Sequence, residues 1–137
     1  MMRRRIPDKY RAQSMISAAE VEIKFTKTLE TTKESSSTII RNIYESFRML
    51  GDALLLIRGK EAVGVDHHGE MIKELFTLKV NTSRPIQVLL NLKTMRHKIN
   101  YQGYIPHIEE AKDAISIMDT CFHPLVNKIK EELQKLL

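Results

Sequence analysis

The chain has 137 residues, which suits a single domain with one hydrophobic core. Hydrophobic residues make up 42% and charged residues 28%, and no apolar run approaches the length of a membrane span, so neither a disordered chain nor a membrane protein is expected. The formal net charge of +5 permits binding to RNA or DNA without requiring it.

The N-terminal residues 1–8 are predicted to form a mobile basic tail of one domain that covers residues 1–137. The basic run Arg3–Arg5 is followed by no apolar signal-peptide core, so secretion is not expected. The single cysteine, Cys121, excludes an internal disulfide and suits the reducing cytoplasm, where we expect the protein to act. Its apolar setting is typical of a core thiol rather than a nucleophile.

Two long helices are expected in the first half. The first runs from about Asp8 to Thr32, and its inner face is predicted to contain Met15, Ala18, Val21, Phe25 and Leu29. Ser35–Ser37 supply a hinge and N-cap candidates for the second, which runs from about Thr38 to Arg58 and ends at Gly59. Its inner face has alternating spacings of three and four residues: Ile40, Ile43, Phe47, Leu50, Leu54 and Ile57.

Three further helices are expected in the second half. A loop over Gly64–Gly69 precedes a short helix that carries Met71, Ile72, Leu75 and Phe76. Pro85 can start a fourth helix, which reaches about Gly103. Pro106 opens a fifth, and Pro124 predicts a kink or a break near His123. Its inner face is predicted to hold Ile108, Ala111, Ile115, Met118, Phe122, Val126, Ile129, Leu133 and Leu136.

No strand pattern is evident, because glycine and proline are too few for a sandwich or a barrel. The sequence therefore predicts an all-α fold, an antiparallel bundle of four long helices plus one short helix. One long apolar seam could be shared with a second copy, so we predict a symmetric homodimer in which the two Arg96 segments face each other across a cleft.

The most informative segment is Arg96–Tyr104, which places a charge on an otherwise apolar helix face. Leu89 and Leu92 lie on that face and Ile99 continues it, but Arg96 follows Leu92 by four residues, and Asn100 comes one turn later. Arginine is almost never buried unless it is paired. Either Arg96 forms a structural ion pair, or it belongs to a polar site for an anionic ligand.

Several polar groups follow Arg96 within two helical turns. On a helix, Arg96 and Asn100 form one row, and His97, Tyr101 and Tyr104 form the neighbouring row. Such a set can hold a phosphate, and His97 could exchange protons near neutral pH. Metal-free cleavage of RNA requires little more than a base, an acid and a cation on the phosphate.

Other kinds of site find no support in the sequence. The five histidines do not form the H-E-x-x-H pattern of a helical zinc site, and His67 and His68 are adjacent, so we expect no metal. The glycines lack the spacing of a phosphate-binding loop, and no signature of a serine or cysteine nucleophile is present. We expect no cofactor.

Two stretches resemble the HEPN family. Residues Ile40–Leu75 look like its second helix, terminal glycine and following loop, and Leu92–Tyr104, LKTMRHKINYQGY, looks like its motif helix. The resemblance implies a helical, commonly dimeric fold and a metal-independent ribonuclease, often a toxin paired with a minimal nucleotidyltransferase antitoxin. The family motif is an Arg, a polar residue and then a His; Arg96 and His97 match its start, whereas Tyr101 occupies the place of the His.

Three hypotheses follow. The first is a divergent HEPN ribonuclease or toxin, in which Arg96 holds phosphate, His97 transfers protons, and Asn100 and Tyr101 orient RNA. The second is an inactive HEPN dimer that binds RNA, a nucleotide or a nucleotidyltransferase at the same seam, with Arg96 and Tyr104 as binding residues. The third is a purely structural protein in which Arg96 forms an internal ion pair.

Overall fold

The protein is mostly helical, as its sequence predicts. A computed structural model of the chain describes residues 2–64 and 67–137. The long helices are α1 (Lys9–Thr26), α2 (Ser36–Arg58), α4 (Leu89–Gln102) and α5 (Ile108–Gln134), with the shorter α3 (His67–Leu75) and the 3₁₀ turn η1 (Ile86–Val88) between them. Among the described residues, no helix has both the length and the apolar character needed to cross a membrane.

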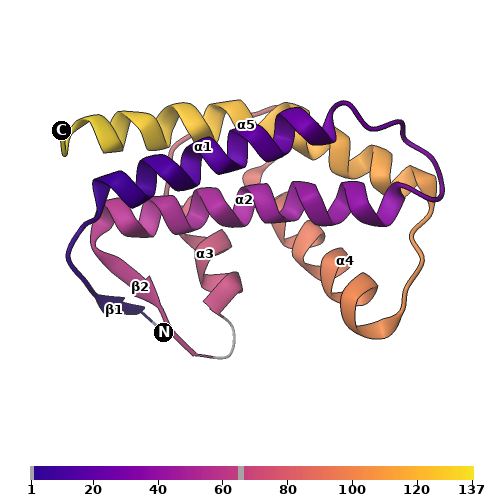
Figure 1. Cartoon of the computed structure of the whole chain (residues 1–137), viewed down its shortest axis with the longest axis horizontal. Coiled ribbons are helices and arrows are strands. Elements are labelled where there is room, and N and C mark those ends of the chain that lie inside the picture. Colours follow the sequence, from indigo (N-terminus) through magenta and orange to yellow (C-terminus); the bar gives the residue numbers. More distant parts are fainter. Residues whose placement is uncertain (1, 65–66) are drawn as a thin grey trace.

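Helix α2 is the centre of the molecule. It packs against α1, α3, α4 and α5, whereas α1 and α5 touch each other much less. In Figure 1, α1 runs antiparallel to α2, α5 runs in the same direction as α2, and α3 and α4 lie on the side of α2 away from α1. All six residues predicted for the inner face of α2 are buried, which confirms its phase. Gly59 ends the helix with φ of 65°, a left-handed conformation that glycine adopts without strain.

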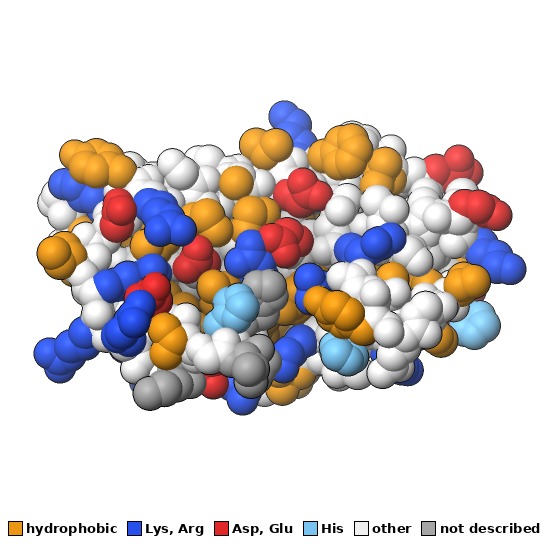
Figure 2. Space-filling model, turned by 60° about the horizontal axis from the view of Figure 1, so that its bottom comes forward, with side chains coloured by type: hydrophobic (Ala, Val, Ile, Leu, Met, Phe, Trp, Pro, Cys, Tyr) orange, Lys and Arg blue, Asp and Glu red, His pale blue; other side chains and the backbone are white. Residues whose placement is uncertain are grey.

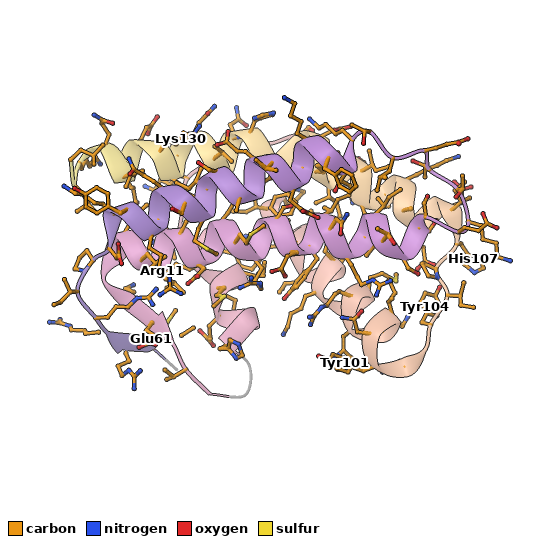
Figure 3. The ribbon with its side chains drawn as sticks, in the orientation of Figure 1. Arg11, Glu61, Tyr101, Tyr104, His107 and Lys130 are labelled. Atoms are coloured by element: carbon orange, nitrogen blue, oxygen red, sulfur yellow. The ribbon has the colours of Figure 1, made fainter. Side chains whose placement is uncertain are left out.

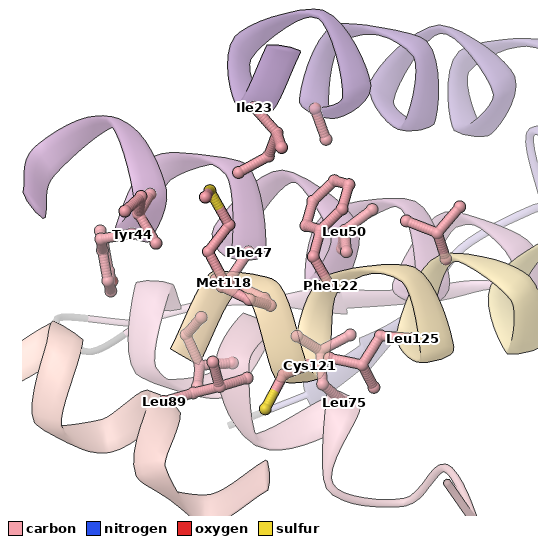
Figure 4. Close-up of a cluster of buried hydrophobic side chains, with 14 of the residues drawn as sticks. Ile23, Tyr44, Phe47, Leu50, Leu75, Leu89, Met118, Cys121, Phe122 and Leu125 are labelled. Carbon is pink, nitrogen blue, oxygen red and sulfur yellow. The ribbon is translucent and has the colours of Figure 1, made fainter. Parts of the chain in front are cut away.

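The core lies where α2 meets its neighbours. Figure 4 shows buried side chains from α1, α2, α3, α4 and α5 gathered around Phe47 and Phe122. Their rings meet edge to face with centroids 5.7 Å apart, a favoured aromatic geometry. Cys121 is buried in this core. Helix α5 contributes most of its predicted face and continues as one helix through Pro124, so of the predicted kink or break near His123 the break does not occur.

A short two-stranded sheet corrects two predictions. Residues Met2–Arg4 (β1) pair antiparallel with Lys60–Ala62 (β2), although no strand was expected and the N-terminal residues were predicted to be a free tail. The pairing continues as the backbone N–H of Arg5 donates to the carbonyl of Gly59 over 2.8 Å. The N-terminal segment is therefore hydrogen-bonded beside the end of α2.

Helix α1 buries a different face from the predicted one. Its core side is made of Ala12, Ile16, Ala19, Ile23 and Thr26. Val21 and Phe25, predicted to be inside, are 67% and 53% exposed, and Ala18 is exposed as well, whereas Met15 and Leu29 are partly buried against the core. The helix also ends at Thr26 rather than Thr32. There the backbone N–H and the Oγ1 of Thr28 both donate to the carbonyl of Phe25, in a turn tighter than an α-helix.

Ion pairs centred on Arg58 connect three helices beyond the apolar core. The guanidinium of Arg58, at the end of α2, contacts Glu74 on α3 over 3.0 Å and Glu132 on α5 over 2.6 Å. The carboxylate of Glu74 is 6% exposed, and Lys60 on β2 approaches it to 3.3 Å. The hydrogen bonds that Arg58 donates to Glu132, and then those to Glu74, raise the pKa of Arg58 despite its partial burial, so it stays charged at all ordinary pH values.

Candidate functional site

Helix α4 presents an unusual outer surface. Leu89 and Leu92 fix its inner face by burial in the core, and Gly103 ends it with φ of 64°. The helix contains no acidic residue, and its cations are Lys93, Arg96 and Lys98. Figure 2 views the molecule from the side of α3 and α4, and basic side chains and histidine rings are visible on this face. A helix surface that has three cations and no acid of its own favours contact with an anion.

Arg96 lies between two tyrosines. Its Cζ atom is 5.5 Å from the ring centroid of Tyr44, a buried residue of α2, and 5.9 Å from that of Tyr101 on α4 itself. Both distances are typical of cation–π contacts. Arg96 makes no ion pair and no hydrogen bond with any residue that the structure describes. Within that part of the chain, the internal ion pair of the structural hypothesis is absent.

His97, Asn100 and Tyr101 remain available to solvent beside this arginine. The rings of His97 and Tyr101 are 5.0 Å apart and inclined by 47°, as expected for neighbours four residues apart on a helix. Both residues are exposed, and so is Asn100. The helix thus brings together four predicted residues: a guanidinium held by aromatic rings, an imidazole, an amide and a phenol.

Tyr104, predicted as a binding residue, lies apart from this group. It follows the end of α4, and its hydroxyl donates to Glu110 of α5 over 2.6 Å (Figure 3). The same carboxylate accepts the backbone N–H of His107 over 2.9 Å, and Lys98 Nζ lies 4.9 Å from the centre of the Tyr104 ring. In this structure Tyr104 connects the end of α4 to the start of α5.

These contacts shift two pKa values at the junction. The hydrogen bond to Glu110 raises the pKa of Tyr104, so its hydroxyl stays protonated. Partial burial opposes ionisation of Glu110, but hydrogen bonds from Tyr104 and His107 and the nearby positive charges outweigh it and lower the pKa of the carboxyl group. Glu110 is therefore an anion at neutral pH and has a structural partner of its own.

A shallow depression of about 330 Å³ adjoins the group, with His97 on its wall. Its other lining residues come from the same helix: Lys93, Thr94, Lys98 and Gln102. The prediction from sequence missed Lys93 and Lys98, and also Tyr44. The absence of acids along α4 could have revealed the two lysines, whereas the contact between Tyr44 and Arg96 joins residues far apart in the chain and has no local signal.

The described residues away from α4 offer little support for a metal site. Within residues 2–64 and 67–137, no three histidine, cysteine or acidic side chains gather as a metal site would need. The imidazole of His67 lies 3.3 Å from the carbonyl of Gly64 at the start of α3. Comparison of the chain with protein-family models, with curated proteins and with solved structures found no match. The assignment of a function therefore depends on the α4 site.

Proposed function

We propose that the protein is a HEPN-like module that binds single-stranded RNA on the outer face of α4, with Arg96 on the phosphate. The observation that carries this proposal is the setting of Arg96. Its guanidinium lies over the rings of Tyr44 and Tyr101, and no acid occupies its N–H donors among the described residues. These cation–π contacts hold the guanidinium in place, and two of its parallel N–H groups can then bind one phosphate.

The rest of the surface suits a nucleic-acid strand better than a lone phosphate. His97 and Tyr101 form an exposed pair of rings on which a base can stack, and Tyr101 is 67% exposed. Lys93 and Lys98 lie on the same helix and can follow the neighbouring phosphates. A free nucleotide would use only part of this surface, so we expect it to bind more weakly than RNA.

Binding without cleavage is the better-supported form of the proposal. The chain departs from the family motif at Tyr101, where the motif has its His, and a phenol is a poor base at neutral pH. A divergent metal-independent ribonuclease or toxin is the second candidate, favoured by the position of His97. That imidazole lies beside Tyr101 and one residue from Arg96, so it could take the proton from a ribose hydroxyl.

The family resemblance also supplies the finer fold and the partners of this proposal. It implies an all-helical HEPN-like domain, a homodimer and a minimal nucleotidyltransferase as antitoxin, to which the sequence pattern adds an antiparallel bundle and a cytoplasmic location. The antiparallel pairing of α1 with α2 supports part of this bundle, whereas α5 runs parallel to α2. Co-purification with the product of a neighbouring nucleotidyltransferase gene, and relief by it of any toxicity on expression, would test the partner.

The binding test is fluorescence anisotropy with a short labelled single-stranded RNA of mixed sequence. Arg96→Ala should weaken binding by about 10- to 100-fold, because hydrogen bonds to a charged group contribute about 1.5–3 kcal/mol. Arg96→Lys should restore binding only in part, since lysine lacks the fork. Arg4→Ala, which removes the same charge from β1, is the matched control and should change affinity only slightly. Equal losses in Arg96→Ala and Arg4→Ala would show general attraction rather than a site.

The cleavage test separates the two candidates. The wild type, Arg96→Ala, His97→Ala and Tyr101→His are incubated with RNA in EDTA. Under the binding proposal the wild type leaves RNA intact, and Tyr101→His gains activity if the surface is otherwise competent. Cleavage by the wild type that disappears in both Arg96→Ala and His97→Ala would instead establish the ribonuclease.

A further inference from the structure

Helix α1 is apolar on two opposite faces. One face enters the core, and the other carries Tyr10, Ala18, Val21 and Phe25 toward solvent at helical spacings. The exposed face holds the larger side chains, which is why the sequence pattern predicts it to be the inner one. An outer stripe with the character of a core face is typical of a surface that another helix covers.

We propose that this stripe is a homodimer interface, in which α1 crosses α1 of a second copy in antiparallel orientation about a two-fold axis near Ser17 and Ala18. The inference does not depend on the proposed RNA-binding function. Small residues lie at the centre of the stripe, where two helices can approach closely, and the large Tyr10 and Phe25 lie toward its two ends.

The positions of the apolar residues agree with a two-fold axis at this point. The midpoint between Tyr10 and Phe25 falls between Ser17 and Ala18, so an antiparallel copy brings each Tyr10 opposite the partner's Phe25. Val21 then packs near the small side chains at the centre. Each copy supplies both halves of the contact, as an isologous interface requires.

The charges beside the stripe are complementary under the same operation. Arg11 and Glu22 lie on the same side of the stripe along α1. The midpoint between them in the sequence is one residue, or about 1.5 Å along the helix, from the midpoint between Tyr10 and Phe25. In an antiparallel pair this side faces its own copy, so each Arg11 meets the partner's Glu22. Neither residue forms an ion pair within the described part of the chain. The charge of Arg11 helps to lower the pKa of Glu61, but only from a distance, and less than the hydrogen bond from Arg3 and the charge of Arg5 do.

This arrangement differs from the dimer predicted from the sequence, in which the two Arg96 segments face each other. Helix α4 carries three cations and no acid, so pairing it with its own copy would bring like charges together. Helices α1 and α4 lie on opposite sides of α2 (Figure 1). A dimer formed through α1 leaves both α4 surfaces open to ligand.

The first test is the oligomeric state of the full chain by sedimentation equilibrium at micromolar concentration. The wild type should be a dimer, and Val21→Glu should weaken the dimer at least tenfold while circular dichroism stays unchanged. Ile105→Glu is the matched control, because Ile105 is 70% exposed in the loop before α5 and should leave the dimer intact. A monomeric wild type, or a dimer equally stable in Val21→Glu, would overturn the proposal.

Charge exchange and cross-linking then test the geometry. Arg11→Glu and Glu22→Arg should each weaken the dimer several-fold, and the double variant should restore it. Ala18→Cys should form a disulfide between copies under mild oxidation, whereas Asn100→Cys should not; the native Cys121 is buried. Cross-linking at Asn100 in place of Ala18 would support the Arg96-facing dimer and overturn this one. Binding of the monomer to lipid vesicles through Val21, without dimerisation, would also overturn it.

Discussion

The ion pairs of Arg58 offer a quantitative test of how α3 and α5 are held to α2. Arg58→Ala removes the arginine partner of Glu74, a carboxylate that is 6% exposed. Breaking a buried ion pair costs about 3–5 kcal/mol, because the remaining charge stays desolvated. Lys60 still approaches Glu74 to 3.3 Å, and Glu132 remains accessible to water, so we expect a smaller loss of about 2–3 kcal/mol.

Urea unfolding followed by circular dichroism measures this loss, and Arg84→Ala is the control. Arg84 pairs with Asp113, which is half exposed, and its removal should cost less than about 1 kcal/mol. Adding Glu74→Gln to Arg58→Ala should recover part of the stability, because the unpaired charge is then gone. The reasoning fails if Arg58→Ala lowers the free energy of unfolding no more than Arg84→Ala does. It also fails if the effects of Arg58→Ala and Glu74→Gln simply add in the double variant.

Three further predictions concern the core and the junction between α4 and α5. Phe47→Ala should lower the free energy of unfolding by about 3–5 kcal/mol. Phe25→Ala should lower it by less than about 1 kcal/mol when the protein is dilute and monomeric. Equal losses in urea unfolding would mean that the exposed face of α1 is assigned wrongly. Gly51→Ala should lower the thermal midpoint strongly, because its Cβ would lie 2.1 Å from a backbone oxygen of α3, and a neutral result would refute that close approach. The pKa of Glu110 is lower in the folded state than in the unfolded state. The ionised carboxylate therefore stabilises the fold at pH values above the usual carboxyl range, and this stabilisation is lost as the pH falls through the lowered pKa. Tyr104→Phe should therefore reduce stability at neutral pH, and the difference from wild type should shrink in acid; a difference that grows in acid would contradict the sign.

The sequence predicts a helix well where a run of apolar residues at spacings of three and four leaves little choice of inner face. In α2 the six residues of that run are buried, and its extent and its Gly59 cap are confirmed, although residues 50–57 are buried on all sides of the helix. In α1 two stripes compete, and the choice between them depends on packing against α2. There the small Ala12 and Ala19 allow the helices to approach closely, whereas Val21 and Phe25 look more like core residues in the sequence.

Contacts between distant residues escaped prediction for a related reason. The strand Met2–Arg4 is short and basic, and its partner lies far along the chain, so no local pattern signals the pairing. The segment Arg96–Tyr101 was found because a charge on an apolar face is itself a local signal. The contact that holds Arg96, the ring of Tyr44, arises only when α4 packs against α2.

The most direct measurement of the central claim is an NMR titration that follows the arginine side-chain Nε–H signals while single-stranded RNA is added. A phosphate bound to the fork of Arg96 should shift the signal of Arg96 in a saturable manner, with the midpoint seen by anisotropy. The signal of Arg4 should change little. If RNA binds while the Arg96 signal stays in place, the phosphate lies elsewhere and the assignment of the α4 site is wrong.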